Sequence, residues 1–311
     1  MSGESSIHRT RIFAVVVLYG QRPSASVTVA TLAGALREAA AVDCHVLIHD
    51  NSPAGELALN ELPENFRYHA AARNRGLLGA YETALAQART EGYDWLLTLD
   101  QDTALPADFF SAIQPGLKAA EDDPRIAAIV PHLAEGEQLL SPAYVRIGRL
   151  KPLPAHFSGV PRREARAFNS AALLRVAALD AIGGFHPCFW LDHLDSWLHH
   201  QFYVQGWRMF VLDSVHLEHH FSLLNYRERV SLPHLQNFLM AESAYMDLYG
   251  RWWEHAAYTA QLGVRLINQM RRREAPEVLQ ATRAAWRRRL TMNRAERLDR
   301  WRREAGCEAR R

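Results

Sequence analysis

The feature that most constrains the fold is an alternation of short apolar segments with segments of helical spacing along the first half of the chain. Residues 12–18 include three consecutive valines, which is typical of a strand buried on both faces of a parallel sheet. Further strands are expected at 45–49, 66–70, 95–99 and 126–130, and helices at 24–41, 77–90 and 106–120. This order predicts an α/β fold with an open, mostly parallel sheet flanked by helices, which binds ligands beyond the carboxyl ends of its strands.

The second half of the chain changes character. Residues 136–166 contain four prolines and are expected to form irregular structure with short antiparallel strands. Strands are expected at 168–174, 207–212 and 215–217, a helix at 192–204, and helices throughout the end of the chain. Residues 1–220 carry a net charge of −6 and residues 221–311 a net charge of +8. We therefore expect two parts, a ligand-binding domain at 1–225 and a basic C-terminal helical extension at 226–311.

Cysteine spacing and hydropathy indicate the cellular compartment in which the protein is expected. Cys44, Cys188 and Cys307 are widely spaced and form no CxxC pair, so a disulfide framework or a zinc site is not expected. The chain has no apolar stretch of about 20 residues, the length that a membrane-spanning helix needs. A cytoplasmic protein is expected, and it can still lie on the surface of a membrane.

Two carboxylates directly follow the apolar strand expected at 95–99. Asp100 and Asp102 would point toward the ligand-binding edge, and carboxylates there suit Mg²⁺ or Mn²⁺ together with substrate phosphates. The alternative is that Asp102 caps the following helix. Asp50 ends the second strand, where it can bind a ribose or a base or simply form an Asx turn with Ser52.

A second group of polar residues precedes the helix expected at 77–90. Arg73, Asn74 and Gly76 lie at its start, where backbone N–H groups and arginine favour a phosphate. The alternative is a turn that needs glycine for its backbone angle. The chain has neither a GxGxxG nor a P-loop sequence, so a dinucleotide or P-loop site is not expected.

Asp192 and Asp195 are three residues apart, so on a helix they would share one face and could act as acid and base. Capping of that helix by Asp192 is the alternative reading. His219 and His220 follow the last expected strand, where a histidine can complete a metal site, bind phosphate or be an ordinary polar strand end.

Taken together, these segments resemble family 2 glycosyltransferases of the GT-A fold, particularly a rhamnosyltransferase-like bacterial branch. The resemblance covers roughly residues 10–225 and depends on the order of VVVLYGQ, HDNSP, RNRGLLGAY, LLTLDQDT, IGGFHPCFWLDHLDSW and LEHHFS. The chain departs from the family pattern in two places. Ser170-Ala171 replaces a common Ser-Gly, and residues 196–200 replace an acidic residue and an arginine that often follow the catalytic base of the family.

The resemblance implies a role for each group. Asp50 and Tyr19 would contact the nucleotide sugar, as would the turn with Arg73, Asn74 and Gly76. Asp100 and Asp102 would hold the metal and the diphosphate, with His219 nearby. Asp195 would be the catalytic base and Asp192 its neighbour on the acceptor side.

The activity implied is inverting transfer of a sugar, with rhamnose as one candidate, from a UDP- or dTDP-linked donor. The acceptor would be a saccharide or a lipid-linked molecule of cell-surface polysaccharide synthesis. The arginine-rich tail could be a solvated face, a homodimer interface or a contact with the inner membrane surface. No nucleic acid is expected, because the ligand-binding part is acidic.

Two other readings stay open. An inactive nucleotide-sugar-binding or scaffold protein could use the same fold. A haloacid-dehalogenase-like phosphatase also uses a DxD motif, but its motif follows the first strand and carries Thr or Val where this chain has Ala104.

Overall fold

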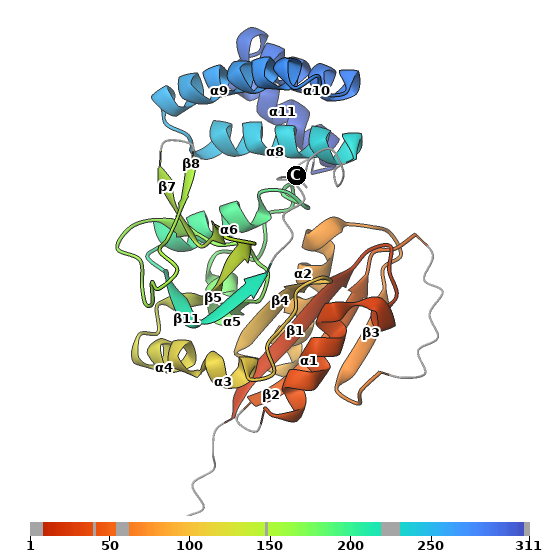
Figure 1. Cartoon of the computed structure of the whole chain (residues 1–311), viewed down its shortest axis with the longest axis vertical. Helices are drawn as coiled ribbons and strands as arrows, with labels where there is room; N and C mark the ends of the chain where they lie inside the picture. Colours follow the sequence, from red (N-terminus) through yellow and green to blue (C-terminus); the bar gives the residue numbers. More distant parts are fainter. Residues whose placement is uncertain (1–8, 40–41, 54–61, 147–148, 219–230, 308–311) are drawn as a thin grey trace, which may run out of the picture.

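The computed structural model describes residues 9–39, 42–53, 62–146, 149–218 and 231–307. A large sheet of eight strands forms its centre (Figure 1). Its strands are β1 (Thr10–Leu18), β2 (Val42–Asp50), β3 (Phe66–Ala70), β4 (Trp95–Asp100), β5 (Ile126–Glu135), β6 (Gln138–Ser141), β10 (Ala172–Arg175) and β11 (Arg208–Glu218). A small sheet contains β7 (Ala143–Arg146), β8 (Arg149–Pro152) and β9 (Ala165–Arg166).

The helices fall into a group around the large sheet and a group at the end of the chain. The first group comprises the 3₁₀ turn η1 (Pro23–Ala25), α1 (Val27–Arg37), α2 (Gly76–Glu91), α3 (Phe109–Ala112), α4 (Gln114–Asp122), α5 (Val176–Ala181) and α6 (Leu194–Val204). The second group comprises α8 (Leu232–Tyr249), α9 (Trp252–Arg271), α10 (Pro276–Thr291) and α11 (Arg294–Glu304). This second group stacks beyond one end of the sheet (Figure 1).

The large sheet is mostly parallel. Its order is β11-β5-β10-β4-β1-β2-β3, with β6 paired to β5. Strands β2 and β4 run parallel to β1, β3 runs parallel to β2, and β11 runs parallel to β5, whereas β10 is antiparallel to both of its neighbours. The carboxyl ends of β1, β2, β3 and β4 therefore meet at one edge of the sheet.

The apolar run in β1 is buried on both faces, as its composition predicts. Phe13 and Val15 belong to the core that α2, α5 and α6 cover, whereas Ile12 and Val16 belong to the core under α1, α3 and α4. Both faces of β1 carry apolar side chains, and helices on the two faces of the sheet bury them.

The predicted fold class is confirmed, but the bounds of several elements differ from those expected. The helix expected at 106–120 is broken between α3 and α4, because Pro115 in the first turn of α4 has no N–H to continue the helical ladder. Strand β10 is shorter than the strand expected at 168–174, and β11 is one strand across 208–218 with a register shift between Val211 and His216. Helix α6 begins at Leu194 rather than Asp192.

The C-terminal helices share the core of the sheet domain. Tyr245 of α8 and Trp301 of α11 pack against Phe189, with ring centroids 6.1 Å and 4.8 Å away. None of the helices that the structure describes is long and apolar enough to cross a membrane.

Candidate active site

Strand register brings the first two candidate carboxylates close together. Leu18 of β1 pairs with Asp50 of β2, and Val17 pairs with Asp100 of β4 on the other side of β1. Because neighbouring strands lie about 4.8 Å apart, the backbones of the two aspartates are separated by roughly 10 Å across the carboxyl edge.

Asp50 is buried, and both of its carboxylate oxygens accept hydrogen bonds. The Ser52 N–H donates to Oδ1 over 2.8 Å, and the Tyr68 hydroxyl donates to Oδ2 over 2.7 Å. The Asx turn is therefore present. It fixes the carboxylate at the end of β2 and leaves each oxygen a second lone pair for a ligand.

The Asp100–Asp102 turn is fastened to the start of α1. The Thr28 hydroxyl donates to the Asp100 carbonyl over 2.6 Å and accepts from the Thr103 N–H over 2.8 Å. Asp100 is half-buried and Asp102 is exposed. The next helix, α3, begins at Phe109 with Asp108 as its N-cap, so the reading of Asp102 as a helix cap is wrong.

The loop after β1 spans the two carboxylate turns. The Tyr19 N–H donates to Oε1 of Gln101 over 2.8 Å, and the Gly20 N–H donates to the Ser52 hydroxyl over 2.8 Å. The Tyr19 side chain is more than half exposed. Its ring therefore lies on the open side of the edge that Asp50 and Asp100 define.

The start of α2 is close to both Asp50 and the Asp192 loop. Asn51, beside Asp50, donates to the Gly76 carbonyl over 3.0 Å, and the Leu78 N–H donates to the Trp190 carbonyl over 3.1 Å. The Gly76 N–H donates to Oδ1 of Asn74 over 2.7 Å. Two of the first N–H groups of α2 thus have protein partners, and Arg73, the predicted phosphate-binding cation, is exposed.

Asp195 lies in the first turn of α6, and Asp192 lies outside the helix. His193, which lies between Asp192 and the helix, is the N-cap and has φ +62°. The predicted single helical face for both carboxylates is therefore wrong, and so is capping by Asp192. A left-handed residue reverses the chain direction locally, and sequence spacing gives no sign of it.

The Asp195 carboxyl has a raised pKa. Burial raises the pKa of Asp195 to about 6, although the Ser196 backbone N–H, 2.5 Å from Oδ1, and the positive charge of Arg166 act in the opposite direction. A carboxyl with this pKa is still largely ionised at neutral pH and is a stronger base than an ordinary aspartate.

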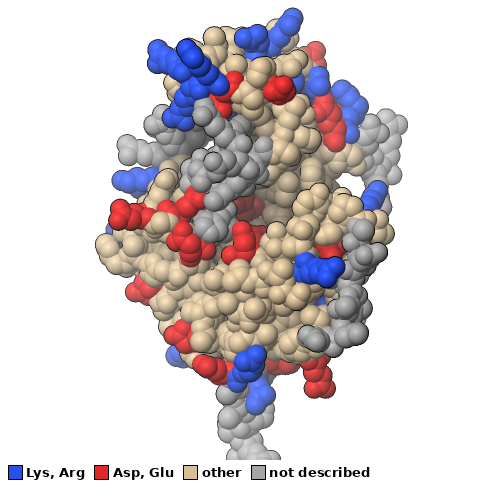
Figure 2. Space-filling model, turned by 45° about the vertical axis from the view of Figure 1, so that its right-hand side comes forward, with Lys and Arg blue, Asp and Glu red and all other residues tan. Residues whose placement is uncertain are grey.

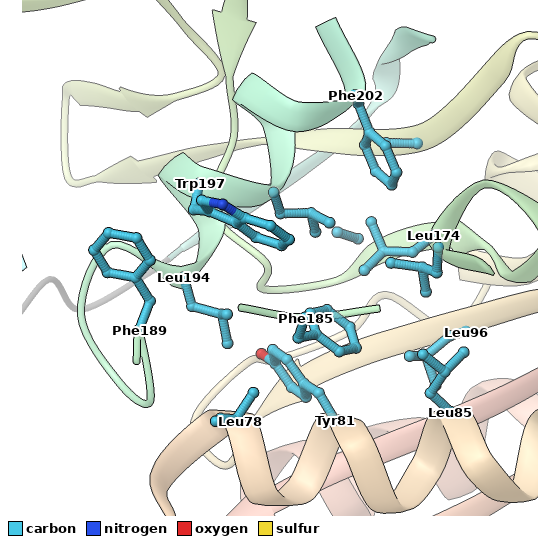
Figure 3. Close-up of a cluster of buried hydrophobic side chains, with 14 of the residues drawn as sticks. Leu78, Tyr81, Leu85, Leu96, Leu174, Phe185, Phe189, Leu194, Trp197 and Phe202 are labelled. Atoms are coloured by element: carbon cyan, nitrogen blue, oxygen red, sulfur yellow. The ribbon is translucent and has the colours of Figure 1, made fainter. Parts of the chain in front are cut away.

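Tyr81 is a buried side chain that the charges of two candidate carboxylates reach. It is fully buried on α2, and after burial itself the charges of Asp100 and Asp195 are the main causes that raise its pKa. Figure 3 shows Tyr81 directed from α2 toward Leu194 and Trp197 of α6, with Phe185 beside it. The charges of Asp100 and Asp195 therefore both act on Tyr81, and α2 and α6 share one hydrophobic core.

Three site residues were not predicted from the sequence. Asn169 is buried beside β4, where Thr98 donates to its carbonyl over 2.6 Å, and neither polar atom of its side chain has a partner among the described residues. His234 and Asn237 of α8 hydrogen-bond to Asp192. The buried amide of Asn169 gave no periodic signal, and His234 and Asn237 reach the site only through packing of the C-terminal helices.

The carboxylates of Asp100 and Asp102 are oxygen ligands of the kind that Mg²⁺ and Mn²⁺ prefer. Within the described part of the chain, no group of three or more His, Cys, Asp or Glu side chains could hold a metal ion. Two carboxylates alone fit a cation that takes its other ligands from substrate phosphates. His219, the third predicted ligand, and His220 lie outside the described residues.

Charge is unevenly distributed over the surface. On the face shown in Figure 2, Asp and Glu side chains gather around a hollow in the middle of the molecule, while Lys and Arg side chains dominate the upper end. The acidic middle suits a cation, and the basic end belongs to the C-terminal helices.

The chain belongs to glycosyl transferase family 2, whose sequence model matches residues 15–180. The match covers more than half of the chain and includes Asp50, Asp100 and Asp102, but it ends before Asp192 and Asp195. No curated protein sequence matches the chain.

The chain is also similar to several solved structures. GalNAc-T7, solved with UDP, GalNAc and Mn²⁺, superposes with a TM-score of 0.57 at 12% identity over 97% of this chain, which spans 55% of that protein. TarS 1-349 of S. aureus gives a TM-score of 0.49 at 14% identity, covering 91% of this chain and 92% of TarS 1-349. The mannosyltransferase PcManGT of Pyrobaculum calidifontis, solved with GDP-Man and Mn²⁺, gives 0.47 at 14% identity, covering 91% and 88%. The predicted family and the GT-A type of fold are confirmed.

Proposed function

We propose that this glycosyltransferase moves a sugar, with inversion, from a nucleoside-diphosphate donor to an acceptor hydroxyl. The observations that support the proposal are that Asp50 and Asp100 lie at the carboxyl ends of β2 and β4, and that the charges of Asp100 and Asp195 both act on the buried Tyr81.

In this proposal the donor lies along the carboxyl edge of β1. Asp50 accepts hydrogen bonds from the nucleoside, Tyr19 covers it from the open side, and Arg73 with the Asn74–Gly76 turn approaches the phosphates. Asp100 and Asp102 would hold Mg²⁺ or Mn²⁺, with His219 as a further proposed ligand. The bound cation would neutralise the charge that develops on the leaving diphosphate.

Asp195 is the proposed general base. It accepts the proton of the acceptor hydroxyl while that oxygen attacks the anomeric carbon on the side opposite the diphosphate. General base catalysis typically contributes about 10²–10⁴-fold to a rate. Tyr81 remains protonated beside Asp195 because burial raises its pKa, so it does not compete for the proton.

For the donor we propose a UDP- or dTDP-linked sugar, with rhamnose as the first candidate, and for the acceptor a saccharide or lipid-linked molecule in cell-surface polysaccharide synthesis. GalNAc-T7, which shares the fold, was solved with UDP and Mn²⁺, and this supports a donor of that class.

A panel of nucleotide sugars tests the proposed function. Purified protein would be incubated with each donor and candidate saccharide acceptors in Mg²⁺, Mn²⁺ or EDTA, and release of nucleoside diphosphate would be measured. We expect release with one donor class and its loss in EDTA. Donor binding without release under any condition would contradict the proposal and favour an inactive binding protein, whereas phosphate release from generic phosphoesters would favour a phosphatase.

We further propose that the basic extension, residues 226–311, holds the enzyme against the anionic inner surface of the cytoplasmic membrane. Helix α9 presents an exposed apolar stripe at spacings of three and four residues, formed by Trp252, Ala256, Ala260, Val264, Ile267 and Met270. The same extension carries exposed arginines at Arg271–Arg273 beyond the end of the stripe, at Arg283 and Arg287 on α10 and at Arg294 on α11. Apolar residues together with arginines suit a lipid surface.

A further inference from the structure

Both oxygens of the Asp192 carboxylate are already engaged by one helix. Nε2 of His234 lies 3.1 Å from Oδ1, and the Asn237 amide donates to Oδ2. The two partners are three residues apart on α8, so they share one face of that helix. The Asp192 side chain is only 9% exposed, which leaves it little access to a substrate.

The next residue is held by the same face of α8. The ring of His193 lies 5.6 Å from the ring of Phe238 and 5.6 Å from that of Tyr245, and it is nearly parallel to the latter. Burial lowers the pKa of His193, so the ring packs as a neutral aromatic. Its left-handed backbone costs about 1–2 kcal/mol for a residue with a side chain, and the packing against α8 offsets that cost.

Helix α8 continues along the helix that carries Asp195. The Trp197 indole N–H donates to the Tyr249 hydroxyl over 2.9 Å, and the His200 ring lies 4.7 Å from the ring of Tyr249. Contacts from His234 to Tyr249 thus fix the loop before Asp195 and the turns after it.

We propose that α8 is the positioning element of the acceptor side, with His234 and Asn237 as positioning residues that hold Asp192 so that Asp195 faces the acceptor. The proposal rests on the proposed transferase function. In this proposal Asp192 has a structural role and takes no part in proton transfer. Helix α8, which belongs to the basic extension, is then necessary for catalysis.

The charges around the loop predict the direction in which the pKa of Asp195 changes when His234 is removed. The hydrogen bond to Asp192 raises the pKa of His234, and the Asp192 charge is among the causes that raise the pKa of Asp195. The groups facing Asp195 also include Arg166 of β9, which acts in the opposite direction, while Glu164 is paired with His200 over 2.9 Å. Removing the His234 cation leaves Asp192 uncompensated and should raise the pKa of Asp195 further.

Kinetics of His234→Ala and Asn237→Ala test the proposal, with Gln236→Ala as the control because Gln236 is exposed on the same helix. We expect kcat to fall by about 10²-fold in the first two variants, the loss typical of a small displacement of catalytic groups, while donor affinity and the control stay unchanged. In the pH profile of kcat/KM, the acid limb should move to higher pH in His234→Ala. It should return to its wild-type position in His234→Lys, which restores the cation.

Hydrogen exchange of the peptide containing residues 186–196 gives a readout that does not need activity. We expect faster exchange in His234→Ala and Asn237→Ala than in the wild type and in Gln236→Ala. Unchanged exchange, or a loss of kcat with no movement of the acid limb, would overturn the positioning role. If exchange rose but the wild-type protein transferred no sugar, the positioning of the loop would stand and the proposed function would fall.

Discussion

At the scale of single residues, Gly76 shows how local backbone geometry serves the site. It has φ +62°, and a Cβ atom there would lie 2.4 Å from the Trp190 carbonyl oxygen, the acceptor of the Leu78 N–H. Only a residue without a side chain allows the start of α2 to approach the loop that leads to Asp192. The sequence predicts a turn at Gly76, whereas the approach of this turn to the Trp190 loop is a property of the fold.

Gly76→Ala should therefore destabilise the protein and lower transfer. The positive φ alone costs an alanine about 1–2 kcal/mol, and the overlap with Trp190 adds to that cost. Gly92 is the matched control, because it has φ +71° at the other end of α2 and its nearest contact would be 3.4 Å away. Thermal unfolding and transfer rates would be compared, and equal losses in Gly76→Ala and Gly92→Ala would refute the role of the close approach.

Ser170-Ala171, which replaces the common Ser-Gly, also has an unusual backbone conformation. Ala171 has φ +55°, a conformation that glycine favours, so the chain makes this turn with a side chain present. Ser170 is tied to Thr103 by a 2.6 Å hydrogen bond between hydroxyls, which places the turn beside the Asp100–Asp102 motif.

At the scale of elements, the buried strands were the easiest to predict. Continuous apolar runs identify β1 and β4, and the rule that ligands meet the carboxyl ends of parallel strands then selects Asp50, Asp100 and Asp102. The start of α6 and the break at Pro115 were missed, because each depends on one backbone position that periodicity does not report. His234 and Asn237 could not be found, since they lie about 40 residues from Asp192 along the chain.

Helix α8 keeps its place through a buried ion network. The Asp247 carboxylate is fully buried and accepts hydrogen bonds from Arg289 of α10 over 2.7 Å and from Arg297 of α11 over 2.7 and 2.8 Å. His255 of α9 lies 3.4 Å from the same carboxylate. One acidic side chain on α8 thus joins the other three C-terminal helices.

Asp247→Asn should lower the free energy of unfolding by about 3–5 kcal/mol, because it leaves the two arginines buried without their counter-charge. Asp299→Asn is the control, since Asp299 is exposed and its pair with Arg302 is worth at most about 1 kcal/mol. Chemical denaturation would measure both. A loss for Asp247→Asn no larger than that of the control would show that the network does not hold the helices together.

At the scale of the whole molecule, the sheet domain and the basic extension act together. The extension shares its core with the sheet domain through Tyr245 and Trp301, and it presents the apolar stripe of α9 at the opposite, exposed surface. An enzyme arranged in this way could keep its acidic site above a membrane that holds a lipid-linked acceptor.

Val264→Glu combined with Ile267→Glu should abolish sedimentation with phosphatidylglycerol vesicles, because both side chains lie exposed in the stripe. Val204→Glu is the control, since Val204 is equally exposed but lies on α6. Binding should weaken with salt and be absent with neutral phosphatidylcholine vesicles. A wild-type protein that ignores anionic vesicles, but forms a dimer that the double substitution separates, would assign the stripe to a homodimer interface instead.

The central claim is that Asp195, in the first turn of α6, is the base of a metal-dependent sugar transfer. The most direct measurement compares donor affinity and single-turnover transfer in the wild type and in Asp195→Asn, once the donor is known. We predict that donor affinity persists while the transfer rate falls by about 10²–10⁴-fold, because the amide cannot accept the proton. Transfer at nearly the wild-type rate in Asp195→Asn would contradict the account.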